Sequence, residues 1–165
     1  MKSLKIIPSL LEGSIRIPPS KSISHRAIIC AGLAEGLSRI ENIILSEDIK
    51  ATLEGLVALG VPEPVAEKEE NSWTLNSRGT SKLKSVSSTV NCRESGSTLR
   101  FLVPLATLTG EKITFTGQGK LVERPLDAYY DIFDEQRLEY STNGGLLPLT
   151  VNGHLKPGTY KLKGN

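Results

Sequence analysis

A short basic segment near the start of the chain combines residue types that bind oxyanions. Residues 20–26 read SKSISHR and lead into an apolar run that is typical of a helix. Free N–H groups at a helix N-terminus favour an anion, and Lys21 adds a mobile positive charge. Ser22 and Arg26 lie four residues apart on one helix face, where Arg26 can contact phosphate or carboxylate with two prongs. This predicts an oxyanion site, with a solvated basic helix start as the alternative; the glycines of a nucleotide-binding P-loop are missing.

Two later segments contain related chemistry. Residues 94–98 (ESGST) place hydroxyl groups before a second apolar helix, and Gly96 would let a ligand approach the backbone closely. A simple serine N-cap is the alternative interpretation of this segment. In residues 117–125 (GQGKLVERP), Arg124 precedes a proline that we expect in the first turn of a helix, so that the arginine extends from a rigid base.

The elements that position these segments form a repeat. The first unit is predicted to contain a strand at 13–17, helices at 27–34 and 46–59, and further strands at 39–44, 72–75 and 82–86. Ser46 is the expected N-cap of the second helix, and Gly60 its C-cap. The second unit is predicted to contain a strand at 88–92, a loop at 93–97, a helix at 98–108 and a strand at 112–116. Residues 158–163 match residues 13–18 and begin a third copy.

The arrangement of these units indicates the fold class. Unit one would occupy residues 13–86, unit two 87–147, and the start of unit three 148–165. Units of strand, helix, strand, helix and paired strands cannot each bury both faces alone, so we expect them to pack about a common axis. Coincidental alternation of strands and helices is the alternative, but the matching loop chemistry favours a repeat.

Composition and charge exclude several classes of function. The chain of 165 residues is 38% apolar and 23% charged, and its 20 Lys and Arg are offset by 18 Asp and Glu. This balance is typical of a folded domain and argues against a nucleic-acid binder, which would have a basic stripe. The N-terminus lacks the apolar core of a signal peptide, and no segment has the roughly 20 apolar residues of a membrane span. We therefore expect a cytoplasmic protein with no membrane partner.

The cysteines and histidines indicate neither a disulfide framework nor a metal site. Cys30 lies in an apolar helical run and Cys92 in a strand-like run, and no CxxC motif is present. His25 and His154 are the only histidines, and neither has a second histidine at a helical interval. We expect two reduced thiols and no metal.

Three segments, in order and spacing, resemble successive motifs of the 5-enolpyruvylshikimate-3-phosphate synthase family: residues 20–26 (SKSISHR), 95–100 (SGSTLR) and 123–126 (ERPL). The resemblance covers essentially the whole chain. It implies an α+β fold in which repeated βαβαββ units pack around a pseudo-threefold axis, an enolpyruvyl transferase-like α/β prism or inside-out α/β barrel, incomplete in this chain. It also implies that residues 1–12 form a strand of the other domain, and that residues 13–165 form a partial enolpyruvyl transferase domain.

The resemblance also implies an activity. Members of the family transfer the carboxyvinyl group of phosphoenolpyruvate to the 5-hydroxyl of shikimate 3-phosphate and release phosphate, in chorismate and aromatic amino-acid biosynthesis. By resemblance, Lys21 and Arg124 would be catalytic. Lys21, Ser22 and Arg26 would bind shikimate 3-phosphate, and Lys21, Gly96 and Arg124 would bind phosphoenolpyruvate. No cofactor is implied; the partners would be these two small molecules, and the full-length enzyme is expected to be a monomer.

The chain departs from the family pattern at two positions in the second segment. Arg93-Glu94-Ser95 replaces the usual Gly-Asn-Ala or similar small run, and Phe101 stands where many members have proline. The first change puts a charged pair near the expected phosphoenolpyruvate site. Arg100 matches a family arginine for which we expect a structural or supporting role.

Two alternative functions remain. The related transferase that acts on UDP-N-acetylglucosamine would carry a Lys-Asn pair in the first segment, and Lys21-Ser22 argues against it. The other alternative is a non-catalytic anion-binding fragment, because the family's next motif, a Ser-Ser-Gln run, would follow Asn165 directly. We therefore expect this chain alone to bind shikimate 3-phosphate weakly at best and not to turn over.

Overall fold

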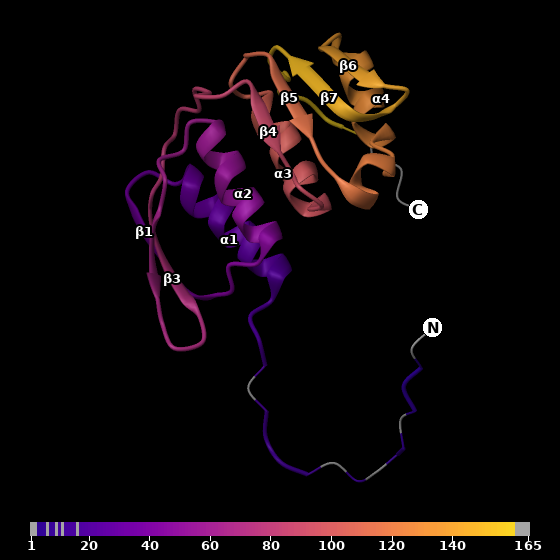
Figure 1. Cartoon of the computed structure of the whole chain (residues 1–165). Helices are drawn as coiled ribbons and strands as arrows, with labels where there is room; N and C mark the ends of the chain where they lie inside the picture. The colour runs from indigo at the N-terminus through magenta and orange to yellow at the C-terminus, as the bar shows by residue number, and fades with distance from the viewer. Residues whose placement is uncertain (1–2, 6, 9, 11, 16, 161–165) are drawn as a thin grey trace.

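The computed structural model describes residues 3–5, 7–8, 10, 12–15 and 17–160. Its regular elements, in chain order, are α1 (Lys21–Leu33), β1 (Leu37–Ile43), α2 (Glu47–Ala58), β2 (Val65–Lys68), β3 (Trp73–Arg78), β4 (Thr89–Asn91), α3 (Gly96–Ala106), β5 (Ile113–Thr116), the 3-10 helix η1 (Gly119–Glu123), α4 (Asp127–Gln136), β6 (Glu139–Asn143) and β7 (Leu146–Asn152). Figure 1 shows the α1–β3 part beside the β4–β7 part, with α2 and α3 facing each other where they meet.

The two parts have the same sheet topology. The first sheet has the order β1-β3-β2 and the second β4-β5-β7-β6. In both, the strand that follows the first helix pairs antiparallel with the last strand of the unit, which in turn pairs antiparallel with the strand before it. The repeat is therefore seen in the strand pairing of both parts, although β7 extends beyond residue 147, where the second unit was expected to end.

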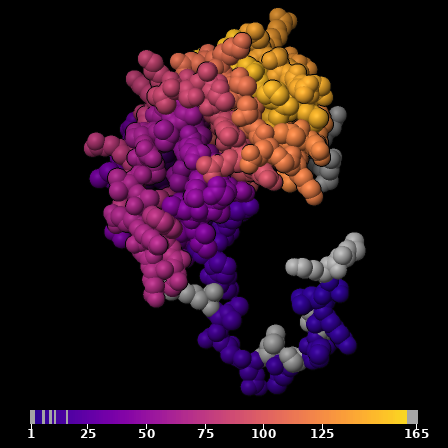
Figure 2. Space-filling view, in the orientation of Figure 1, coloured from indigo at the N-terminus to yellow at the C-terminus, as the bar shows by residue number. Residues whose placement is uncertain are grey.

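The first sheet lacks the strand that was predicted at residues 13–17. In the second sheet, β4 pairs parallel with β5, but Gly13, Ser14, Ile15 and Ile17 form no strand. Ile15 is 88% exposed and Ile17 is 76% exposed, in a segment that extends away from the folded body (Figures 1 and 2). A strand needs a partner and a buried face, and this segment has neither among the described residues. The assignment of residues 1–12 to another domain stays a prediction.

Two other predicted strands are absent from the structure, and one observed strand was not predicted. Residues 82–86 form no strand; they are held by side-chain and backbone hydrogen bonds, among them Val86 N–H to the Ala58 carbonyl. The strand β2 was missed, because Pro62 and Pro64 precede it and its residues are all exposed. Residues 158–160 form no strand, and the rest of the expected third copy, 161–165, lies outside the described residues.

Three helices begin at a serine N-cap. The side chains of Ser20, Ser46 and Ser95 each accept a hydrogen bond from the backbone N–H three residues later. This confirms Ser46 as the start of α2. It also explains why α1 begins at Lys21 rather than at Ala27, because the serine satisfies one of the free N–H groups of the first turn. The basic residues of the first segment therefore lie on the first two turns of a helix.

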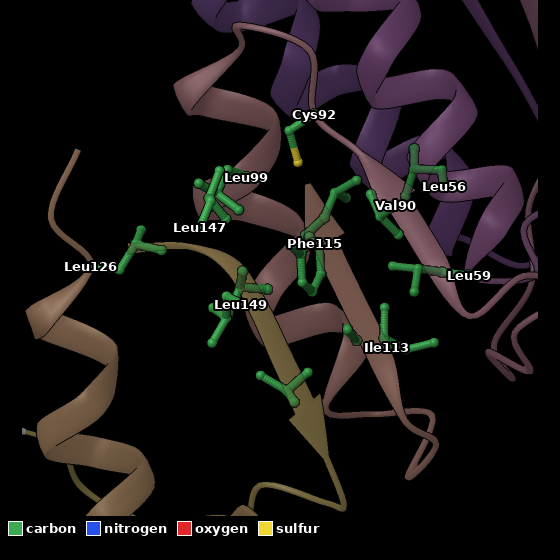
Figure 3. Close-up of a cluster of buried hydrophobic side chains, with 14 of the residues drawn as sticks. Leu56, Leu59, Val90, Cys92, Leu99, Ile113, Phe115, Leu126, Leu147 and Leu149 are labelled. Atoms are coloured by element: carbon green, nitrogen blue, oxygen red, sulfur yellow. The ribbon is translucent and has the colours of Figure 1, made fainter. Parts of the chain in front are cut away.

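One hydrophobic core joins the two parts. Leu56 of α2, Leu59 at the C-cap of that helix and Val90 of β4 lie against the cluster around Phe115 (Figure 3). α2 approaches α3 closely at Gly55, where an added Cβ would lie 2.4 Å from Leu102 Cδ1. The shared core fixes the N-termini of α1, α2 and α3 relative to one another, and these ends carry the candidate site.

Candidate active site

Lys21 and Asp48 join the first turns of α1 and α2. Lys21 Nζ lies 2.7 Å from Asp48 Oδ2, and the lysine side chain stays 58% exposed. Asp48 is an acidic residue in the first turn of α2. An acidic residue at a helix start can be recognised in the sequence, but its pairing with Lys21 requires the packing of α1 against α2.

Ser22 and Arg26 form a single unit on the exposed face of α1. Arg26 Nη1 donates to the Ser22 carbonyl at 2.8 Å and to Ser22 Oγ at 2.5 Å. The Arg26 guanidinium also lies over the ring of Phe101 on α3, 5.0 Å from its centroid. Phe101 thus supports the arginine by a cation–π contact.

Gly96 lies beneath two arginine side chains. A Cβ added at Gly96 would lie 2.8 Å from Arg124 Nη1 and 3.1 Å from Arg100 Nη1. The two guanidinium groups therefore converge on the first residue of α3, where backbone N–H groups are free to bind an anion. Gly96 and Arg124 were expected here, whereas only a structural or supporting role was expected for Arg100. The Arg100 guanidinium lies beside that of Arg124.

The backbone carbonyl of Arg100 accepts a hydrogen bond from outside its own helix. Pro104 has no N–H to donate to the Arg100 carbonyl one helical turn earlier. Tyr129 of α4 fills this gap, because its hydroxyl donates to the Arg100 carbonyl at 2.6 Å. Burial raises the pKa of Tyr129, so its hydroxyl stays protonated and able to donate.

Arg124 is the residue after η1, between two buried leucines. Its backbone N–H donates to the Leu121 carbonyl at 3.1 Å, and both Leu121 and Leu126 are buried. The prediction that Pro125 occupies the first turn of a helix is wrong: α4 begins at Asp127 with Leu126 as its N-cap. The expected rigid base is present nevertheless, and it consists of η1 and the two leucine anchors.

Arg93 and Glu94, the charged pair at the start of the second segment, contact different elements. Arg93 pairs with Glu47 and, at 2.7 Å, with Glu54, both on α2, so its charge is used to tie the segment to that helix. A hydrogen bond from Lys50 and the nearby charges of Lys50 and Arg93 lower the pKa of Glu47. Glu94 lies against Gly119 at the start of η1, where an added Cβ would be 2.6 Å from its Cδ. Arg93 therefore does not contribute a free cation.

The remaining cations of the site are unpaired. Among the ion pairs of the described residues, none includes Arg26, Arg100 or Arg124. Unpaired guanidinium groups that converge on helix N-termini are suited to bind a small polyanion. In the described part of the chain no group of three or more His, Cys, Asp or Glu side chains could hold a metal ion, and no helix is long and apolar enough to span a bilayer.

This architecture has solved counterparts. Two structures of EPSP synthase from Acinetobacter baumannii superpose on the chain with TM-scores of 0.71 and 0.70, at 26% and 25% identity, over 93% of this chain. The matched region is only 33% and 34% of those two chains. The repeated α/β units and their cationic helix ends thus define an enolpyruvyl transferase fold, of which this chain contains a part.

Sequence relatives give the particular family. Residues 6–165 match the family described as EPSP synthase (3-phosphoshikimate 1-carboxyvinyltransferase), and the chain belongs to that family. It is 54% identical to the 3-phosphoshikimate 1-carboxyvinyltransferase of Clostridium novyi and 55% identical to that of Clostridium kluyveri. All of this chain is covered in both cases, but only 39% and 38% of those relatives. The alternative that acts on UDP-N-acetylglucosamine is not favoured by these relatives.

Proposed function

We propose that this chain forms one part of the substrate site of a 3-phosphoshikimate 1-carboxyvinyltransferase. The reaction would join the 5-hydroxyl oxygen of shikimate 3-phosphate to the carboxyvinyl carbon of phosphoenolpyruvate and release inorganic phosphate. The observation that carries the proposal is the convergence of Arg100 and Arg124 over Gly96, with neither arginine in an ion pair of the described residues.

The two substrates would use different helix ends. Arg26, held by Ser22 and Phe101, would bind shikimate 3-phosphate on the α1 face together with Ser22. Gly96 and Arg124, with Arg100 added, would bind the phosphate and carboxylate of phosphoenolpyruvate. Because both substrates are polyanions, cations must screen their repulsion before carbon and oxygen can meet.

Lys21 would act between the two sites. It lies on the first turn of α1 beside Ser22, and its partner Asp48 is linked to the second segment through the Asp48 carbonyl, which accepts from Thr98 Oγ1 at 3.2 Å. A lysine there could contact both substrates and move a proton during addition and elimination. The acid and base groups that complete the reaction would come from outside this chain.

A chimera tests the proposal. It joins residues 1–165 to the part of the Clostridium kluyveri relative that this chain does not cover, and phosphate release is measured with both substrates. We expect steady turnover by the chimera, none by the isolated chain, and none by the chimera with Lys21→Met. A folded chimera without turnover would refute the proposed function, and steady turnover by the isolated chain would refute its expected inactivity.

Cellular location and assembly belong to the same proposal. We propose a cytoplasmic enzyme that is monomeric at full length, supported by the family resemblance. Light scattering of the chimera during size-exclusion chromatography measures the second point, and a mass twice that of one chain would contradict it.

A further inference from the structure

A buried chain of hydrogen bonds runs beneath the candidate site. His25 Nδ1 lies 2.8 Å from Thr52 Oγ1, which lies 2.7 Å from Thr98 Oγ1, which lies 2.7 Å from Ser95 Oγ. All four residues have 0% exposure. Four polar side chains from three helices are thus joined in a row without access to water, where each hydrogen bond has a large influence on geometry.

Both ends of this chain lie at the substrate segments. His25 is on α1, one helical turn after Lys21 and adjacent to Arg26. Ser95 is the N-cap of α3 and is adjacent to Gly96. In the middle, Thr52 and Thr98 both lie within hydrogen-bond distance of the Asp48 carbonyl, at 3.3 and 3.2 Å. The chain therefore links the start of α1, which presents Lys21 and Arg26, to the start of α3 at Gly96.

The surroundings of His25 favour one direction of donation. His25 Nε2 is buried and has no hydrogen-bond partner among the described residues. A buried N–H without a partner is rarer in proteins than a buried acceptor without one. The proton therefore belongs on Nδ1, which donates to Thr52, and each hydroxyl can then donate onward to Asp48 O, Thr98 or Ser95.

The ring also stays neutral. Burial lowers the pKa of His25, and the nearby charges of Lys21 and Arg26 lower it further, while Asp48 opposes them. Phe101, 6.5 Å away between ring centroids, covers the ring from α3 and offers no acceptor to a second N–H. A neutral imidazole has a single N–H to place, so its tautomer decides whether Thr52 accepts a hydrogen bond from the ring or donates one to it, and thereby which bonds the Thr52 hydroxyl can make to Thr98.

We propose that His25, as the neutral Nδ1–H tautomer, is a positioning residue that directs the His25–Thr52–Thr98–Ser95 chain and so holds Gly96 in register with the Lys21–Arg26 segment. The inference rests on the proposed function for its substrates but not for its geometry. The competing explanation is that these four residues stabilise the core and have no influence on substrate binding.

The first test reads the tautomer without any ligand. Ring nitrogen chemical shifts of His25, measured by NMR on this chain labelled with 15N at neutral pH, distinguish the two neutral forms. We expect protonated Nδ1 and bare Nε2. Protonated Nε2 would overturn the proposal whether or not the chain belongs to an active enzyme, so this result is separable from failure of the proposed function.

A matched pair of variants tests the effect on binding in the chimera. The amide nitrogen of asparagine can occupy the place of Nδ1, whereas that of glutamine occupies the place of Nε2. His25→Asn should keep the KM for phosphoenolpyruvate within about threefold, because it still donates to Thr52. His25→Gln should raise that KM about tenfold, the equivalent of one misdirected buried hydrogen bond, and change the KM for shikimate 3-phosphate less than about twofold.

Hydroxyl variants separate positioning from stability. Thr98→Val removes the hydroxyl at nearly constant volume and should repeat the effect of His25→Gln, whereas Thr98→Ser should not. Thr107→Val removes a buried hydroxyl outside the chain, one that donates to the Pro104 carbonyl at 2.7 Å, and should leave both KM values unchanged. Equal KM values for the asparagine and glutamine variants, or an equal rise in Thr107→Val, would overturn the proposal.

Discussion

Lys21 Nζ lies 2.7 Å from Asp48 Oδ2, in an ion pair that joins the N-terminal turns of α1 and α2. The lysine is more than half exposed, and such pairs contribute only about 0–1 kcal/mol because water screens them. An arriving anion can therefore compete with the carboxylate for Lys21. Asp48 holds the lysine at the site and also opposes the binding of a negatively charged ligand.

The first prediction follows from this competition. Asp48→Asn should tighten the binding of phosphoenolpyruvate to the chimera up to about fivefold, because an exposed pair worth under about 1 kcal/mol no longer has to be broken. Isothermal titration calorimetry measures the change, and Glu41→Gln, which removes an acid on β1 paired with Arg39, is the control. Weaker binding in Asp48→Asn would mean that the carboxylate is needed to place the lysine.

Gly96→Ala should change the KM for phosphoenolpyruvate but not the KM for shikimate 3-phosphate. The added Cβ would lie 2.8 Å from Arg124 Nη1 and 3.1 Å from Arg100 Nη1, so both guanidinium groups must move. Because these are the ends of flexible side chains, the fold should be kept. We expect the KM for phosphoenolpyruvate in the chimera to rise about tenfold, as for the loss of one charge-assisted hydrogen bond, with the KM for shikimate 3-phosphate unchanged. An equal rise in both constants would contradict the assignment of Gly96 to one substrate.

Phe101 should affect the other substrate. Its ring lies 5.0 Å from the Arg26 guanidinium carbon, and a cation–π contact of this kind is worth about 0.5–1 kcal/mol at an exposed site. Phe101→Leu should therefore raise the KM for shikimate 3-phosphate about two- to fivefold, whereas Phe101→Tyr, which keeps the ring, should not. Steady-state kinetics of the two variants measure this KM. Equal KM values for the leucine and tyrosine variants would show that the Phe101 ring does not support Arg26.

Much of the fold could be predicted from local sequence. The helix predicted at 46–59 differs from α2 by only one residue at each end. Its ends could be predicted from Ser46 and Gly60, because capping and periodicity act within a few residues. The strand at 13–17 was wrong for a different reason. Its alternating pattern is real, but a strand forms only against a partner, and pairing depends on which segments meet in three dimensions.

The candidate site could be predicted from the sequence only in part. Lys21, Arg26, Gly96 and Arg124 could be identified because each stands at a recognisable helix start or turn. Thr52 could not, since a threonine inside an amphipathic helix has no sequence signal of its own. Its role depends on packing α2 between α1 and α3, which brings three hydroxyl groups and an imidazole into one row.

His25 should make the stability of the chain depend on pH. Burial lowers its pKa in the folded state below 6.5, its ordinary value, so the unfolded chain binds more protons in that window. The free energy of unfolding must then rise with pH between the folded and unfolded pKa values, by at most about 1.4 kcal/mol per pH unit for one proton, and become level above pH ~6.5. Thermal unfolding from pH 5 to 7.5 measures this slope, and His25→Asn, which cannot titrate, should reduce it. An unchanged slope in that variant would show that the proton is taken up elsewhere and that the pKa of His25 is not lowered by folding.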